Sequence, residues 1–312
     1  MPFDGVSSQS GIEAEFLPNI CHLGGNAGVH IARSAARRAR TDGLGWIRDR
    51  MTDKLPLVIA VLNNKGGVGK TTAAVNLAAA LAAPRRNVLL IDLDSQASAS
   101  LWCGVDRGRL RPSSANALLE GAPLLQVTRP TSVPHLDLVT GSAELASADL
   151  VLSEVPGREL TLKHLTQRLK HQYEIVILDC PPNLSLIGVN AIVAADALVV
   201  PVTAQHLAVE GLVSLLASVD KVRVRLGTRT RLLGILLTMV DPTRTAASEI
   251  RERLRAQYRD DVFHTEILAS RALEEAPASA QTIFQFAPRS RAADGFRRLA
   301  GEVLERARTI KH

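Results

Sequence analysis

Apolar and polar residues follow one another along the chain in blocks that predict an α/β fold. Short runs rich in branched apolar residues indicate buried parallel strands, and the longer alanine- and leucine-rich segments indicate helices. The predicted strands are 57–62, 87–93, 136–139, 174–179, 197–202 and 232–239, and the predicted helices are 71–83, 159–170, 185–194, 208–224 and 291–307. This alternation predicts one doubly wound, mostly parallel sheet with helices on both faces.

The segment between the second and third predicted strands is less regular than the rest. Four prolines divide it into short helices and turns because proline interrupts both helices and inner strands. They are Pro112, Pro123, Pro130 and Pro134. We find no candidate chemistry in this segment.

Residues 1–54 do not share the pattern of the remaining chain. The first fifty residues hold six arginines and five acidic residues, so a basic DNA-binding arm is not indicated. We expect a disordered N-terminal extension over 1–54 and a separate α/β domain over 55–312. A small helical segment at Ile31–Trp46 that binds a partner is the alternative, on composition alone.

Composition is typical of a globular cytoplasmic protein. The chain has 312 residues, and 46% of them are hydrophobic, which is ample for a core. Its three cysteines, Cys21, Cys103 and Cys180, are widely spaced, which fits a reduced compartment better than a disulfide framework. We expect no membrane span and no signal peptide, because no apolar run is long enough and the N-terminus lacks the required order of charged and apolar residues.

Basic charge is concentrated in the C-terminal half. The formal net charge is +6, which is a weak indication of a polyanionic partner. Residues 221–259 contain ten basic residues and three acidic residues. Any nucleic-acid contact is therefore expected there.

The segment Val58–Thr72, V-I-A-V-L-N-N-K-G-G-V-G-K-T-T, joins a predicted strand to a predicted helix through a glycine-rich loop. Such a loop can turn its backbone N–H groups toward phosphate at a helix N-terminus. Lys70 would reach the β- and γ-phosphates, and the Thr71 hydroxyl would ligate Mg²⁺. The predicted nucleotide-binding residues are Lys65, Gly66, Gly67, Val68, Gly69, Lys70, Thr71 and Thr72.

The loop differs from the ordinary G-x-x-x-x-G-K-[ST] pattern at two positions. Asn64 occupies the place of the first glycine, and Lys65 adds a second lysine that the loop itself does not need. This N-K-G-G-V-G-K-T-T string resembles the deviant Walker A motif of the ParA/MinD family of ATPases. The resemblance implies that Lys65 crosses a dimer interface to the partner's nucleotide, so Lys65 and Lys70 are both catalytic candidates.

Three aspartates lie at or just beyond the ends of predicted strands and would meet at the carboxyl edge of the sheet. The string I-D-L-D-S-Q-A-S resembles the D-x-D-x-Q signature of the same family. By that resemblance, Asp94 positions the attacking water and contacts the Mg²⁺ shell, with Asp92 in support. Asp179 ends an apolar strand in a Walker B pattern and would hold Mg²⁺ through a water. Cys180 beside it is interpreted as a small apolar residue.

Segments 237–241, 273–277 and 287–296 resemble C-terminal signatures of the ParA, or Soj, branch. The resemblance covers about Pro56–Arg306. This sequence differs from the family pattern at two places. The family's proline near Leu268 is missing. The position of the family's arginine before the Glu-Ala-Pro element is occupied here by Ala272, and the neighbouring residue is Arg271.

The resemblance implies a partition ATPase that binds Mg-ATP, closes into a sandwich homodimer and then binds DNA without sequence preference. A ParB-like partner would stimulate hydrolysis and release the DNA, and the protein would be cytoplasmic and nucleoid-associated. The family's Asp-Ala-Arg-Thr, which carries a DNA-contacting arginine, is matched by Asp241–Thr245 with one additional residue. The DNA-binding candidates are Arg244 from that match, Arg271 from its displaced position, and Arg223, Arg225 and Arg251 from local charge.

Two rival functions stay open. A MinD-like membrane-cycling ATPase would end in an amphipathic membrane anchor, whereas the apolar face of helix 291–307 favours packing on the sheet. An iron–sulfur ATPase like nitrogenase iron protein would need paired ligand cysteines, which the spacing of the cysteines does not supply. The sequence leaves open whether the cargo is a chromosome or a plasmid, and which residues contact adenine.

Overall fold

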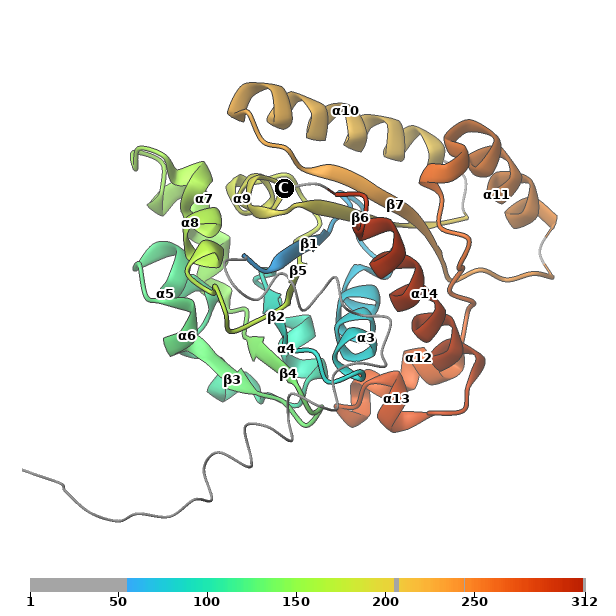
Figure 1. Ribbon diagram of the computed structural model, residues 1–312, viewed down its shortest axis with the longest axis horizontal. Coiled ribbons are helices and arrows are strands. Elements are labelled where there is room, and N and C mark those ends of the chain that lie inside the picture. The colour runs from blue at the N-terminus through green and yellow to red at the C-terminus, as the bar shows by residue number, and fades with distance from the viewer. Residues whose placement is uncertain (1–54, 205–207, 244, 311–312) are drawn as a thin grey trace, which may run out of the picture. The chain divides into compact units, whose positions relative to one another are not determined.

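The computed structural model describes residues 55–204, 208–243 and 245–310. Within these ranges, seven strands form one sheet in the order β3-β4-β2-β5-β1-β6-β7 (Figure 1). The strands are β1 (Leu57–Val61), β2 (Val88–Asp92), β3 (Thr128–Pro130), β4 (Leu136–Val139), β5 (Ile175–Asp179), β6 (Ala197–Thr203) and β7 (Arg231–Thr238). All neighbouring strands pair in parallel except β3, which is antiparallel to β4. The predicted fold class is confirmed.

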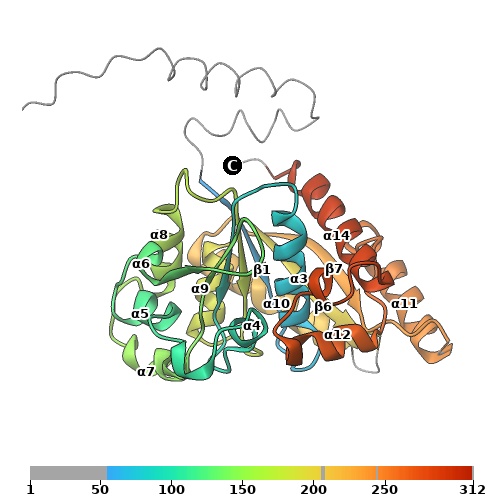
Figure 2. The same cartoon turned by 90° about the horizontal axis from the view of Figure 1, so that it is seen from below.

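Helices cover both faces of the sheet (Figures 1 and 2). One layer contains α3, α4, α12, α13 and α14, and the other contains α5 to α11. The helices are α3 (Lys70–Ala82), α4 (Ser98–Trp102), α5 (Ser114–Leu119), α6 (Leu124–Val127), α7 (Ala148–Val151), α8 (Thr161–Gln167), α9 (Leu186–Ala194), α10 (Ala208–Leu226), α11 (Thr245–Tyr258), α12 (Arg271–Glu275), α13 (Ile283–Phe286) and α14 (Arg291–Ala307).

Apolar layers cover both faces of the central strand β1, which explains why its sequence is continuously apolar. Leu57, Ile59 and Val61 pack into the layer that contains α3 and α14. Val58 and Ala60 alternate with them and pack into the opposite layer. A strand covered on both faces has no solvent-facing side, so a polar residue at any of these positions would be buried.

The structure differs from the sequence prediction in the region around β3 and α8. The sequence predicted short helices and turns there, whereas 128–130 form an antiparallel edge strand that ends at Pro130. Proline is tolerated at an edge because its missing N–H leaves no inner pairing unsatisfied. The predicted helix 159–170 is shorter than expected: a 3₁₀ turn occupies Arg158–Leu160, and the α-helix covers Thr161–Gln167.

The last helix packs on the core, as the sequence predicted. Phe296, Leu299 and Val303 are fully buried against the α3 layer. None of the helices in the described ranges combines the length and apolar character needed to span a bilayer. The prediction of a disordered extension over 1–54 concerns residues that lie outside the described ranges.

Candidate nucleotide-binding site

The phosphate loop, residues 63–70, connects the end of β1 to the start of α3. Gly67 has φ 72°, and Gly69 has φ 81° as the residue that caps α3. These left-handed conformations strain any residue that carries a Cβ, so both positions favour glycine. The first helical residue is Lys70, which places the loop's backbone N–H groups at a helix N-terminus, where an anion is favoured.

Lys70 lies inside this loop. Its side chain is 7% exposed, and its Nζ donates a hydrogen bond to the Lys65 carbonyl at 2.7 Å. Burial lowers the pKa of Lys70, while the charges of Asp179 and Asp94 act to raise it. An ammonium already held by a single backbone carbonyl and facing carboxylates is placed to exchange that carbonyl for phosphate oxygens, which are stronger acceptors.

Two polar contacts from distant strands hold the loop. Asn63 donates from Nδ2 to the Pro201 carbonyl in β6 at 2.7 Å and accepts from the Lys65 backbone N–H at 3.0 Å. At the end of β7, the Thr238 hydroxyl donates to the Val68 carbonyl at 2.8 Å. Neither Asn63 nor Thr238 could be identified from the sequence, because no local pattern indicates a contact between segments so far apart.

Asp179 is the most unusual group of the site. It is fully buried at the end of β5, and neither carboxylate oxygen has a hydrogen-bond partner among the residues that the structure describes. Burial, and then the charge of Asp92, raise the pKa of Asp179 well above its usual range, and the neighbouring Thr71 hydroxyl and Lys70 ammonium lower it in part. A buried carboxylate without donors is costly unless a cation compensates it.

These orphaned oxygens fit Mg²⁺. The ion prefers oxygen ligands and usually binds through one or two carboxylates together with substrate phosphates and waters. Asp179 supplies the carboxylate, and Thr71, next to Lys70 in the first turn of α3, supplies a hydroxyl beside it. The donor set at this edge of the sheet therefore suits a magnesium–nucleotide complex.

Asp92 organises the loop that follows β2. Its Oδ2 accepts from the Ser100 backbone N–H at 2.9 Å and from the Ser100 hydroxyl at 2.6 Å, and its Oδ1 accepts from the Asp94 backbone N–H at 3.1 Å. Complete burial raises the pKa of Asp92 to about 6, although these donors act in the opposite direction. The supporting role that the resemblance implies for Asp92 stays a prediction; the contacts show that Asp92 holds the loop that carries Asp94.

Asp94 is presented by this loop and is only half-buried. Its Oδ1 accepts from the Gln96 backbone N–H at 3.0 Å. Its charge acts on both Lys70 and Asp179, so it lies close to the phosphate end of the site. Asp94 therefore combines access to solvent with closeness to the phosphate loop, as a group that orients water requires.

Comparison with known proteins agrees with this geometry. A protein-family model described as an AAA domain matches residues 57–232. The sporulation initiation inhibitor protein Soj of Bacillus subtilis (strain 168) is 37% identical over 79% of this chain and 97% of its own length. The chromosome-partitioning ATPase Soj of Thermus thermophilus is 43% identical over 80% of this chain and 95% of its own length. The chain belongs to the ParA/Soj family of partition ATPases.

A solved structure agrees with this assignment to the ParA/Soj family. Cobyrinic acid a,c-diamide synthase from Mycobacterium smegmatis, with bound ADP and magnesium, superposes with a TM-score of 0.72 at 28% identity, covering 82% of this chain and 97% of that one. That protein holds a nucleotide and a magnesium ion on the same fold.

The structure distributes the predicted DNA-binding arginines of this ParA-family chain over three helices. Arg223 and Arg225 belong to α10, Arg251 to α11 and Arg271 to α12. Arg244 lies outside the described residues.

Several of these arginines are paired with carboxylates. Arg251 binds Glu266 at 2.8 Å and is 27% exposed, and Arg223 binds Asp220 at 2.8 Å. Arg271 is 88% exposed and lies 3.7 Å from Glu275. Because Arg251 is paired and its side chain is the least exposed of the three, it is the least accessible to a DNA phosphate.

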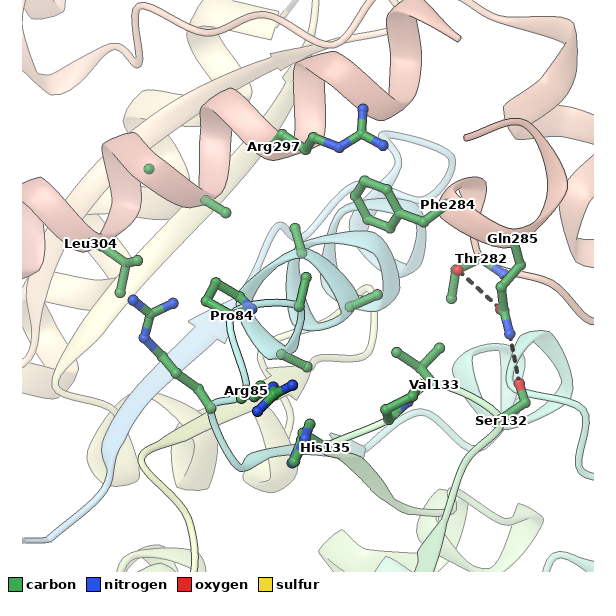
Figure 3. Close-up of a pocket in the computed structure, with 18 residues that line it drawn as sticks. Pro84, Arg85, Ser132, Val133, His135, Thr282, Phe284, Gln285, Arg297 and Leu304 are labelled. Atoms are coloured by element: carbon green, nitrogen blue, oxygen red, sulfur yellow. Dashed lines mark hydrogen bonds between the residues drawn. The ribbon is translucent and has the colours of Figure 1, made fainter. Parts of the chain in front are cut away.

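A cavity lies at the C-terminal end of α3, opposite the end that carries the phosphate loop (Figure 3). It is a groove of about 1040 Å³ lined by the end of α3, residues 132–135, α13 and α14. The Arg297 guanidinium lies 5.3 Å from the centre of the Phe284 ring and is also bound to Asp294. No residue of the phosphate loop lines this groove, so it is separate from the nucleotide site of the ParA-family chain.

Proposed function

We propose that this ParA-family ATPase binds Mg-ATP at the carboxyl edge of β1, β2 and β5 and uses the nucleotide state to control DNA attachment during partition. The observation that carries the proposal is the buried Asp179 carboxylate, which lies beside the phosphate loop with the Thr71 hydroxyl as its neighbour and has no hydrogen bond of ordinary geometry from any described residue. ATP and Mg²⁺ together supply the charges that this arrangement requires.

Each part of the site has a distinct task. The glycines of the loop admit the phosphates to the N-terminus of α3, and the Lys70 ammonium neutralises phosphate charge. Asp179 and the Thr71 hydroxyl hold the metal, with Asp94 near its hydration shell. Bound Mg²⁺ supplies electrostatic stabilisation of the charge that develops on the phosphates.

Asp94 acts on the water that attacks the terminal phosphate. Its carboxylate accepts a hydrogen bond from that water and orients it, because the loop fixed by Asp92 presents Asp94 at the open side of the site. Lys65 acts in the second protomer of an ATP-bound homodimer, where its ammonium reaches the partner's nucleotide. After hydrolysis, the terminal phosphate leaves as inorganic phosphate and takes away the charge that Lys65 binds, so the dimer opens.

Partition then follows from DNA binding by the dimer. Two copies of each basic segment face one duplex, and contacts to phosphates do not depend on base sequence. A ParB-like partner bound at the cargo stimulates hydrolysis and releases the DNA. The relatives that support this proposal include proteins described as chromosome partitioning protein ParA, from Myxococcus xanthus and Caulobacter vibrioides.

The test is retention of duplex DNA by the full-length protein with ATP, with ADP and without nucleotide, at increasing salt. We expect ATP-dependent binding to unrelated sequences, with log affinity falling by roughly 0.9 per log unit of salt for each phosphate contact. Arg244→Ala should weaken binding equally across sequences and flatten that slope, while ATP-driven dimerisation persists. Arg168→Ala, which removes an exposed arginine at the end of α8 and outside the basic segment, is the matched control.

Two results would contradict the proposal. Wild-type protein that does not bind DNA in the ATP state, but sediments with anionic liposomes, would favour the MinD-like alternative. An unchanged slope and affinity in Arg244→Ala would remove that residue from the DNA interface. The packing of α14 on the core speaks against a membrane anchor at that helix.

A further inference from the structure

The side chain of Lys65 lies directly on the backbone of α10 at Gly211. A Cβ built on Gly211 would lie 2.6 Å from Lys65 Cε, 3.0 Å from its Nζ and 3.5 Å from its Cδ. The first distance is shorter than real Cβ contacts allow. Alanine at position 211 would therefore displace the Lys65 side chain, whose flexible end can move without disturbing the backbone.

Glycine is an unfavourable residue at this position of a helix. Gly211 is in the first turn of α10, and helical glycine costs about 1 kcal/mol relative to alanine. Its φ is not in the left-handed region, so backbone conformation does not require glycine here. The close approach of Lys65 is the feature of the structure that explains the missing side chain.

The backbone of Lys65 is fixed, so only its side chain can relocate. The Lys65 N–H donates to Asn63 Oδ1 at 3.0 Å, and the Lys65 carbonyl accepts from Lys70 Nζ at 2.7 Å. In the chain without nucleotide, these two hydrogen bonds keep the backbone of the loop in place, while the Lys65 side chain can move between α10 and another position. Moving this one side chain requires much less free energy than moving the backbone of the whole loop.

The helix dipole of α10 does not favour an ammonium at this position. The N-terminal end of a helix carries partial positive charge, which disfavours a cation. A polyphosphate offers several charged oxygens that bind an ammonium strongly. Phosphate oxygens are therefore suitable acceptors for the Lys65 side chain when it leaves α10.

We propose that Gly211 is a docking point that holds the Lys65 side chain on α10 in the single chain, and that Lys65 must leave it to act across the dimer. The second half of the proposal rests on the proposed function. Gly211 is a positioning residue, because it acts through its contact with Lys65. Docking on α10 disfavours premature dimerisation, because each protomer must first release its lysine.

The first test examines docking without any dimer. Full-length protein without nucleotide is treated with an acetylating reagent, and modification of Lys65 is followed by mass spectrometry, with exposed Lys221 at the far end of α10 as internal reference. Gly211→Ala should raise the rate at Lys65 several-fold. Gly301→Ala, a helical glycine with open space around its Cβ position, should leave the rate unchanged. Equal Lys65 rates in wild type and Gly211→Ala would overturn the docking.

The second test is ATP-dependent dimerisation, measured by sedimentation. Gly211→Ala should lower the dimer dissociation constant by roughly twofold to tenfold, a common range for residues in direct contact. Gly301→Ala should leave the dissociation constant unchanged. No change in Gly211→Ala, a weaker dimer, or an equal change in Gly301→Ala would each overturn the role assigned to Gly211.

The two tests separate this inference from the proposed function. If wild-type protein forms no ATP-dependent dimer, the proposed function fails, and the acetylation rates still decide whether Lys65 docks on Gly211. If the dimer forms and the acetylation rates do not differ, the proposed function survives and the docking does not.

Discussion

At the residue scale, the site combines a carboxylate without well-formed hydrogen bonds, Asp179, with a carboxylate that accepts several, Asp92. Asp179 and Asp92 are both fully buried at neighbouring strand ends. Asp92 is satisfied by Ser100 and the following backbone, whereas Asp179 has no hydrogen-bond partner among the described residues. One carboxylate therefore builds the loop, and the other is left for a cation.

The two lysines of the loop give the first prediction, because their environments differ. Lys70 is buried inside the loop, and Lys65 is half-buried against α10. Lys70→Ala should weaken ATP binding by about 100-fold, since it removes a charged donor to the phosphates. Lys65→Ala should keep appreciable ATP binding but lose ATP-dependent dimerisation and hydrolysis. Calorimetry with ATP and sedimentation in its presence measure these effects, and normal dimers of Lys65→Ala would contradict the cross-dimer role.

The second prediction follows from the raised pKa of Asp92. Because its folded pKa is about 6 rather than 3.8, the folded state binds the proton more tightly, and stability is lost as pH rises from about 4 to 7. The contribution is about 3 kcal/mol at most from this shift. Chemical denaturation at several pH values should show the unfolding free energy of wild type falling relative to that of Asp92→Asn. A constant difference would show that Asp92 titrates normally.

At the element scale, the ends of four parallel strands shape one edge of the sheet. The end of β1 becomes the phosphate loop, β2 presents Asp94, β5 ends in Asp179, and β7 reaches the loop through Thr238. Neighbouring strands in register bring Asp92 opposite Asp179. Gly141, which follows β4, packs closely against Asp92 and the backbone of Asp94.

Gly141→Ala should disturb the loop after β2. A Cβ at this position would lie 2.5 Å from the Asp94 carbonyl oxygen and 2.8 Å from Asp92 Oδ1. These atoms are held by backbone hydrogen bonds and cannot move cheaply, so we expect a loss of about 1–3 kcal/mol in unfolding free energy. ATP hydrolysis should fall as well, because Asp94 shifts. Gly108→Ala, which has open space around it, is the control for both measurements.

At the scale of the whole molecule, both apolar layers on the sheet, as far as the structure describes them, are formed by residues between 57 and 310. The layer that contains α3 is completed by α14, the last helix of the described chain. Residues that contribute no part of either layer should be dispensable for folding.

The last prediction therefore concerns truncation. A chain that begins at Met51 should express, bind ATP and dimerise like the full chain, with a melting temperature within about 2 °C of it. Circular dichroism and ATP titration provide the measurements. A chain that begins at Ile59, which loses Leu57 and Val58 from the central strand, should be strongly destabilised. Failure of the Met51 chain to fold would place the first fifty residues within the core.

The sequence by itself determined the elements whose signals are local. The strand and helix that flank the phosphate loop, the strands that end near the aspartates, and α14 are each encoded by adjacent residues, so these elements and their order were predicted correctly. The roles of the loop residues and aspartates stay predictions. Elements with weak local signals were predicted less well. Edge strand β3 has three residues and ends in proline, and the helix expected at 159–170 begins with a 3₁₀ turn.

Only the tertiary structure decided the contacts between distant segments. Asn63 meets Pro201, Thr238 meets Val68, and Gly211 receives Lys65. No local pattern encodes these pairs, because each depends on the order in which strands lie side by side in the sheet. Strand order follows from burying both faces of the sheet together, which is a property of the whole domain and not of any one segment.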